Sequence, residues 1–169
     1  MRSFKLVLYP DEVLRKPSQE IKTIDEQLHG LIKAMSEIMY ANNGIGLAAP
    51  QVGYLSRVIM FDVGDGLLTL INPEIITTKE GVDYREEGCL SLPGISVGIN
   101  RPTKIKVKAI TPSEEEVVLN LSGLKARVVQ HEVDHLNGRL IIDYASTVQR
   151  LQFKEKLEKL EKRYPFDLI

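Results

Sequence analysis

The sequence predicts an α+β fold that combines an antiparallel sheet with a few helices. Short strand-like runs separated by turn residues fill residues 57–121. Apolar residues recur at helical spacing before that region, in residues 24–39, and after it, in residues 124–137. The 169 residues, 43% hydrophobic and 27% charged, suit one globular domain with a full-sized core.

Composition and charge exclude several classes of protein. A net charge of −1 gives no sign of a nucleic-acid footprint, so no DNA partner is expected. No apolar run is long enough to span a membrane or to act as a signal peptide. The single cysteine, Cys89, cannot form an internal disulfide, and a free thiol suits a reducing compartment. A cytoplasmic protein without membrane contact is therefore expected.

The first forty-odd residues contain a possible strand and one well-marked helix. Residues 6–9 have the composition of a strand, and residues 10–15 that of a short helical turn. Thr23 and Glu26 have the spacing of a capping box. The apolar residues that follow predict a packing helix that ends at residues 43–44.

The next segment, residues 44–51, is small and apolar apart from Gln51 at its end. It lacks the third glycine and the following helix of a dinucleotide-binding fingerprint, so a phosphate cradle is not expected. Two interpretations remain. Gly44 could end the helix and Gly46 could form a turn. Alternatively, Gly46 could let backbone approach a ligand while Gln51 aims an amide donor at it.

The strand-like runs of residues 57–121 favour antiparallel hairpins. The predicted pairs of runs that flank a turn are 58–63 with 67–71, 75–78 with 82–86, and 104–108 with 117–119. Pro73 is expected to loosen the end of its strand. The lysines in residues 104–108 alternate strictly with apolar residues and are expected to face solvent.

Residues 130–135 contain an H-E-x-x-H motif in a helical context. At about 100° per residue, His131 and His135 lie about 40° apart on one face, so both imidazoles can reach one ion. The apolar residues around them cover a broad arc, which predicts a mostly buried helix. Glu132 falls within that arc and needs a buried partner, such as a water molecule at the metal. The alternative is an amphipathic helix whose histidines are ordinary core residues.

A catalytic metal site usually has a third protein ligand and an open position. Cys89, after a strand-like run, is the best candidate, although a cysteine by itself more often serves as a small buried hydrophobe. The long zinc-protease motif fails because Ile141 stands where its last histidine should be. A thermolysin-like ligand would be Glu155 or Glu158, but both lie among lysines on a predicted surface helix, about residues 146–163.

With these segments the chain resembles the bacterial peptide deformylases. Residues 44–51, 87–91 and 130–135 match the three motifs of that family in order, with no departure at a motif position. The similarity extends from the N-terminal segment to about residue 142. It implies antiparallel β-sheets surrounding the H-E-x-x-H helix, with an N-terminal packing helix and a C-terminal helix, in a single catalytic domain of residues 1–169.

The resemblance also implies a reaction and a cofactor. The enzyme would release formate from the N-formylmethionyl peptides of newly made proteins. Cys89, His131 and His135 would hold one divalent metal ion. The resemblance favours Fe(II), and the same ligand set also accepts Zn, Ni or Co.

The remaining site residues receive roles by the same resemblance. Glu132 would take a proton from water and return it to the leaving amine. The Gln51 side-chain amide and the Leu90 backbone N–H would meet negative charge on the formyl oxygen. The residues expected to bind substrate are Ile45, Gly46, Gly88, Leu124 and Val128.

Other functions stay open at this point. They are a nucleophilic Cys-His hydrolase that uses Cys89, a metallo-endopeptidase with Glu155 as ligand, and a noncatalytic binding module stabilised by a metal. A closed structural site needs four protein ligands, and only three can be found. Residues 150–163 contain six basic and three acidic residues, a net charge of +3. They predict a solvated helix or, alternatively, a transient contact with ribosomal RNA near emerging chains.

Overall fold

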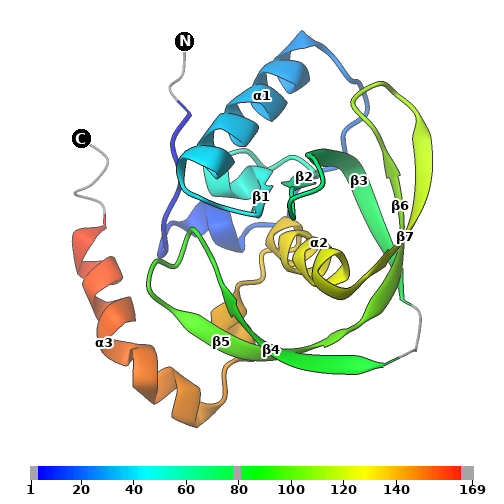
Figure 1. Cartoon of the computed structure of the whole chain (residues 1–169). Helices are drawn as coiled ribbons and strands as arrows, with labels where there is room; N and C mark the ends of the chain where they lie inside the picture. The colour runs from blue at the N-terminus through cyan, green and yellow to red at the C-terminus, as the bar shows by residue number, and fades with distance from the viewer. Residues whose placement is uncertain (1–3, 78–80, 165–169) are drawn as a thin grey trace.

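The computed structural model of the protein describes residues 4–77 and 81–164, which form an α+β fold, as predicted (Figure 1). Its helices are α1 (Glu26–Ala41), α2 (Gly123–Leu136) and α3 (Thr147–Arg163). The strands are β1 (Gly46–Ala48), β2 (Val58–Phe61), β3 (Leu68–Thr77), β4 (Val82–Gly88), β5 (Ser96–Pro102), β6 (Lys104–Ile110) and β7 (Glu116–Ser122). The 3-10 helices are η1 (Glu12–Arg15), η2 (Ala49–Val52) and η3 (Ile141–Tyr144).

Two antiparallel sheets enclose α2. The larger has the strand order β1-β2-β3-β6-β7, and the smaller pairs β4 with β5. Helix α2 contacts strands of both sheets, and Figure 1 shows it between them. Its buried apolar side chains, Ala126, Val128, Val129, Val133 and Leu136, pack in one cluster with residues of β2, β3 and β6. The prediction of sheets surrounding the H-E-x-x-H helix is thus confirmed.

Helix α1 begins and ends at different residues from those predicted. Asp25 is the N-cap, and its carboxylate accepts from the Leu28 N–H, so the predicted Thr23–Glu26 capping box is wrong. A carboxylate directly before the first helical residue is among the strongest caps. At the other end Asn42 is the C-cap and Asn43 takes a φ of 54°. Asparagine tolerates this left-handed conformation, so Gly44 is not needed there.

Two predictions about strands are wrong. Residues 6–9 form no strand but make two separate main-chain hydrogen bonds, from Val7 N to Gln51 O at 2.8 Å and from Tyr9 N to Ser91 O at 2.9 Å. The strand predicted for residues 67–71 does not end there but runs on to Thr77 as β3. Pro73 loosens only the pairing, because the register of β3 against β6 shifts between Ile71 and Glu74. A bulge of this kind accommodates a proline that cannot donate to the ladder.

The pairing of β4 also differs from the prediction. The hairpin of residues 58–63 with 67–71 is confirmed as β2–β3, and that of 104–108 with 117–119 as β6–β7. The run 75–78, whose last residue lies outside the described residues, does not pair with 82–86. Instead β3 pairs with β6, and β4 with the unpredicted strand β5. Gly98 and the buried Arg101 interrupt the apolar alternation of β5, so its sequence did not indicate a strand.

The C-terminal helix is confirmed with the predicted bounds. Ser146 caps α3, and its hydroxyl accepts from the Gln149 N–H. Phe153 and Leu160 pack into a cluster with residues of β5 and η3, while the rest of the helix lies along one side of the molecule (Figure 1). No helix in the part of the chain that the structure describes is both long and apolar enough to cross a membrane.

Candidate functional site

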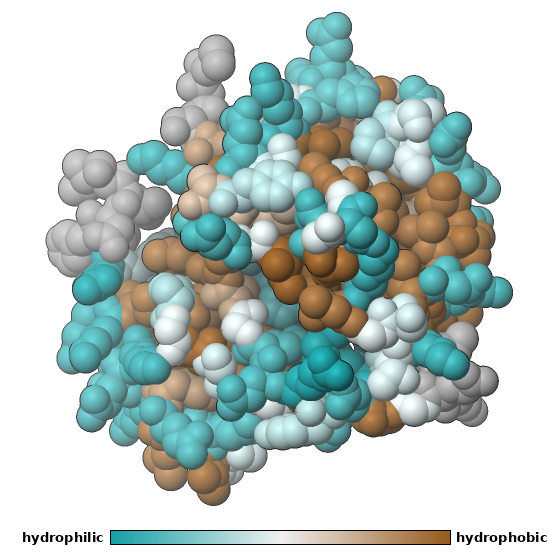
Figure 2. Space-filling view, viewed as in Figure 1, coloured by the Kyte–Doolittle hydropathy of each residue, from teal (hydrophilic) through white to brown (hydrophobic). Residues whose placement is uncertain are grey.

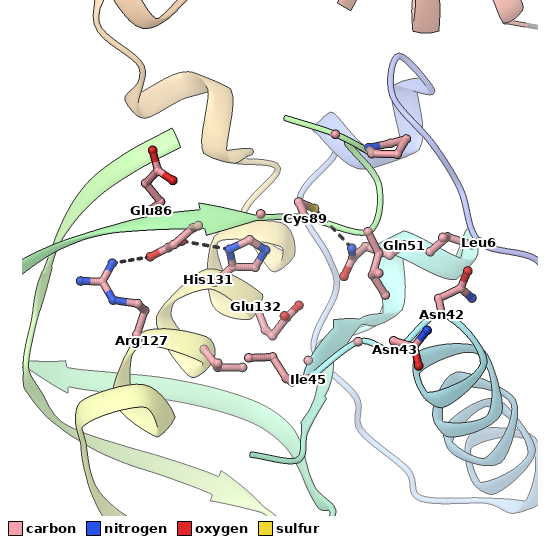
Figure 3. A pocket seen from close by; sticks show the side chains of 18 of the residues that line it. Leu6, Asn42, Asn43, Ile45, Gln51, Glu86, Cys89, Arg127, His131 and Glu132 are labelled. Atoms are coloured by element: carbon pink, nitrogen blue, oxygen red, sulfur yellow. Dashed lines mark hydrogen bonds and ion pairs between the residues drawn. The ribbon is translucent and has the colours of Figure 1, made fainter. Parts of the chain in front are cut away.

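Helix α2 and the loop after β4 bring three potential metal ligands together, two of which, Cys89 and His131, are labelled in Figure 3. The ligand atoms of Cys89, His131 and His135 all lie within 4.8 Å of one another. Cys89 Sγ is 3.3 Å from His135 Nε2. Among the described residues no other Cys, His, Asp or Glu joins this group. One thiolate and two imidazoles, without a fourth protein ligand, fit the open coordination of a catalytic metal site.

Glu87 orients one of these ligands. Its carboxylate lies 3.0 Å from His131 Nδ1. An ionised carboxylate only accepts hydrogen bonds, so Nδ1 carries the proton and the Nε2 lone pair is left for a metal. Arg101 donates to both carboxylate oxygens of Glu87 at 2.9 Å, and Arg127 donates to one at 2.7 Å. Glu87 and its partners therefore fix both the tautomer and the direction of the His131 ring.

The charge of Glu87 is well compensated although the side chain is buried. Burial alone would raise its pKa, but the hydrogen bonds from His131 and Arg101 outweigh burial and lower the pKa to about 2. Arg101 also donates to Asp134 at 2.6 Å and lies over the Tyr144 ring. Because the folded-state pKa of Glu87 is depressed, its stabilising contribution is present above pH 4.5 and is lost as pH falls towards 2.

Neither Glu87 nor Arg101 is among the site residues that the sequence predicts. Strand alternation could have indicated that Glu87 points to the opposite face from Glu86 and Gly88. For Arg101 no local signal exists, because its partners Glu87 and Asp134 lie on another strand and on α2. Arg127 lies outside the apolar arc of α2, yet it is buried, because the β4–β5 sheet covers that side of the helix and supplies its partners.

Glu132 is a buried carboxyl with an unused acceptor. Its side chain is 4% exposed, and Oε2 has no hydrogen-bond partner among the described residues. Burial is the main cause that raises its pKa, from 4.5 to about 7, and His131 has a smaller, lowering effect. A carboxyl that titrates near neutral pH can both accept and return a proton. The unused oxygen fits the predicted need for a buried partner, such as a water molecule at the metal.

Gly46 lies in β1, so the interpretation of this residue as a turn is wrong. A Cβ at Gly46 would overlap Glu132 Oε1 and would lie 2.7 Å from Val128 Cγ1. The close approach that requires glycine is thus made by α2, the helix that carries the H-E-x-x-H motif. Glycine at this position lets Glu132 lie directly against the backbone of an edge strand.

Gln51, on η2, reaches the metal ligands through its amide. Its Oε1 accepts from the Ala48 N–H at 2.9 Å, which turns Nε2 towards Cys89 Sγ at 3.6 Å and Ser91 Oγ at 3.2 Å. The amide is therefore held beside Cys89. Sulfur is a weak acceptor, so the N–H that faces it is free to be shared with a substrate oxygen.

A cavity of about 710 Å³ opens over these groups. The five residues predicted to bind substrate all line it, namely Ile45, Gly46, Gly88, Leu124 and Val128. So do Gln51, Cys89, Leu90, His131 and Glu132, whereas His135, 1% exposed, lies deeper. Apolar side chains gather near the middle of the face shown in Figure 2, over β1 and α2.

Two strand edges border the cavity. On one side lie residues 44–46. The last of them is the first residue of β1, an edge strand of the larger sheet. On the other lie residues 86–88 of β4, which pairs only with β5. Ile45 and Glu86 mark these opposite sides in Figure 3. A strand edge offers unpaired main-chain groups, so an extended peptide fits between them.

Comparison with known proteins gives consistent matches. The family model for polypeptide deformylases matches residues 3–151. A peptide deformylase of Clostridium botulinum is 51% identical over 135 residues, which are 80% of this chain and 91% of the relative. One of Thermodesulfovibrio yellowstonii is 45% identical over 163 residues, 94% and 98% of the two chains. The solved structure of a peptide deformylase from Synechococcus elongatus in complex with actinonin has a TM-score of 0.86 and 39% identity, covering 94% of this chain and 86% of that chain.

Proposed function

The chain belongs to the peptide deformylase family, and from this premise we propose how its residues carry out the reaction. The enzyme removes the N-terminal formyl group from N-formylmethionyl peptides and releases formate. The observation that carries the assignment of residues is the convergence of Cys89, His131 and His135 beside the unused oxygen of Glu132. We further propose that residues 1–169 form a single catalytic domain.

Cys89, His131 and His135 are the residues that would hold the divalent ion. The ion supplies Lewis-acid activation of water and of the formyl carbonyl. We propose Fe(II) as the native metal, with Zn, Ni or Co as substitutes, because a thiolate with two imidazoles accepts all four. We place the enzyme in the cytoplasm, since a free thiol in the site suits a reducing compartment.

The proton transfers fall to Glu132. As a carboxylate it accepts a proton from the attacking water, and as a carboxylic acid it returns that proton to the leaving amine. A pKa of about 7 suits both steps. As negative charge grows on the formyl oxygen, the Gln51 N–H beside Cys89 and the Leu90 backbone N–H donate to it. Gln51 keeps its direction through its bond to the Ala48 N–H.

The shape of the cavity favours a formyl group and a methionine side chain. Glu132 lies against the backbone of Gly46, which leaves little space beside the reacting carbon. A formyl group has hydrogen where an acetyl group has a methyl. Val128 and Leu124 line the neighbouring part of the cavity and offer apolar contact to a flexible methionine side chain.

We expect rapid deformylation of formyl-Met peptides and a kcat/KM on the order of 10²-fold lower for the matched acetyl-Met peptides, because the extra methyl has no space. We expect no cleavage inside casein. The rates are measured by the appearance of free amino termini, with and without a chelator. Equal rates on the two acyl groups would refute the crowded site, and casein fragments would favour an endopeptidase. Activity that survives chelation would favour a nucleophilic Cys-His hydrolase.

We also propose a transient ribosome contact through α3. Arg150, Lys154, Lys159 and Lys162 are exposed on this helix, which carries a net positive charge. Lys154→Glu combined with Lys162→Glu should weaken co-sedimentation with ribosomes at low salt, because fewer phosphates are neutralised. Lys22→Glu with Lys33→Glu makes the same charge change at exposed sites near and on α1 and should leave co-sedimentation unchanged. Equal behaviour of the two double variants would remove this proposal.

A further inference from the structure

Glu86 carries an uncompensated charge at the rim of the cavity. The other acidic and basic side chains that line the cavity are paired or buried, since Glu87 and Arg127 form an ion pair and Glu132 is buried. Glu86 is exposed, and no ion pair or hydrogen bond of its side chain occurs among the described residues. Figure 3 shows it on the side of β4 away from His131. It is thus available to a charged group brought by the substrate.

The smaller sheet provides no cross-strand partner for Glu86. The residue opposite it on β5 is Gly98, which has no side chain. Tyr84 occupies the space above Gly98, because a Cβ added to Gly98 would overlap the Tyr84 hydroxyl. Tyr84, 61% exposed and two residues before Glu86 on β4, shares this face of the strand, and no ion pair joins Glu86 to a lysine or arginine among the described residues.

The cavity determines which substrate residue meets Glu86. The formyl group must reach Cys89 and Glu132 to react. From that end of the cavity, one wall is formed by Gly46 back to residue 42, and the other by Gly88 back to Glu86. An extended peptide along the free edge of β4 is then antiparallel to that strand. Its first side chain points inward, and its second points to the opposite face. Directly opposed residues of an antiparallel pair share a face, so the second residue lies beside Glu86.

We propose that Glu86 makes the enzyme select formyl-Met peptides with a basic residue in second position, directly after the methionine. A lysine or arginine side chain at that position meets the Glu86 carboxylate and the neighbouring Tyr84 ring, whereas an acidic side chain meets like charge. This inference rests on the proposed function, because it takes the formyl group to react at Glu132.

The test compares kcat/KM for formyl-Met peptides that differ only in a second residue of Lys, Gln or Glu. At low salt we expect the Lys peptide to exceed the Glu peptide by about three- to tenfold, the range of an exposed ion pair added to the relief of repulsion. The difference should lie mainly in KM. The ratio of kcat/KM for the Lys peptide to that for the Glu peptide should fall towards one at about 0.5 M salt, where screening is strong.

Substitutions at Glu86 test whether this residue causes the preference for a basic second residue. Glu86→Gln should bring the ratio of Lys to Glu peptide near one, and Glu86→Lys should invert it. Glu115→Gln removes an exposed carboxylate from the β6–β7 turn and should keep the wild-type ratio. A ratio near one in the wild type at low salt, or an unchanged ratio in Glu86→Gln, would overturn the proposal. Failure to deformylate the neutral Gln peptide would instead overturn the proposed function itself.

Discussion

Cys89→Ala is expected to purify without tightly bound metal and without deformylase activity. The variant removes the only thiolate from a group of three ligand atoms, of which the remaining two belong to one helix. Loss of an outer-shell partner already lowers metal affinity by about 10- to 100-fold, so loss of a ligand should lower it by at least about 10²-fold. Metal content per chain, measured on protein purified without oxygen, and affinity by competition with a chelator provide the readouts.

Glu87→Gln is the companion variant, because it keeps Cys89 and changes only the support of His131. Its metal affinity should fall between those of the wild type and Cys89→Ala. Stoichiometric, tightly bound metal in an inactive Cys89→Ala protein would refute the ligand assignment and favour a nucleophilic role for the thiol.

Glu132→Gln is expected to keep its metal and to lose activity by a factor on the order of 10² to 10⁴, the range for a lost general acid–base group. Wild-type kcat/KM should fall as pH drops through the pKa of Glu132, which burial raises above 4.5, because protonation removes the base, and the variant should lack this dependence. Gln has nearly the shape of Glu, so contacts with β1 persist. Near-normal turnover of a metal-loaded variant would contradict the role.

The same variant has a readout that does not depend on activity. The pKa of Glu132 is raised by burial, so ionisation destabilises the metal-free folded state as pH rises from 4.5 to about 7. Glu132→Gln removes that cost. At pH 8 its free energy of unfolding without metal should exceed that of the wild type by up to roughly 3 kcal/mol, as chemical denaturation can measure. Equal free energies of unfolding of the two proteins would show that the charge of Glu132 does not destabilise the folded state.

The sequence by itself determined those features that depend on local spacing. Two histidines four residues apart share one helix face, so the motif placed two ligands without any tertiary information. Apolar periodicity likewise predicted α1 and α3, and turn residues located the β2–β3 and β6–β7 hairpins. The choice of Cys89 as third ligand came from elimination and from resemblance, and the structure places its sulfur next to His135.

Only the tertiary structure decided which distant segments meet. The pairing of β4 with β5 turns Glu87 towards His131 and brings Arg101 to Glu87, and neither contact leaves a pattern in the neighbouring sequence. Gly46 shows the same limit, because the atom that excludes a side chain there belongs to Glu132, far along the chain. Burial and charge compensation arise when separate elements pack, so the pKa values and tautomers that govern the chemistry depend on contacts across sheets.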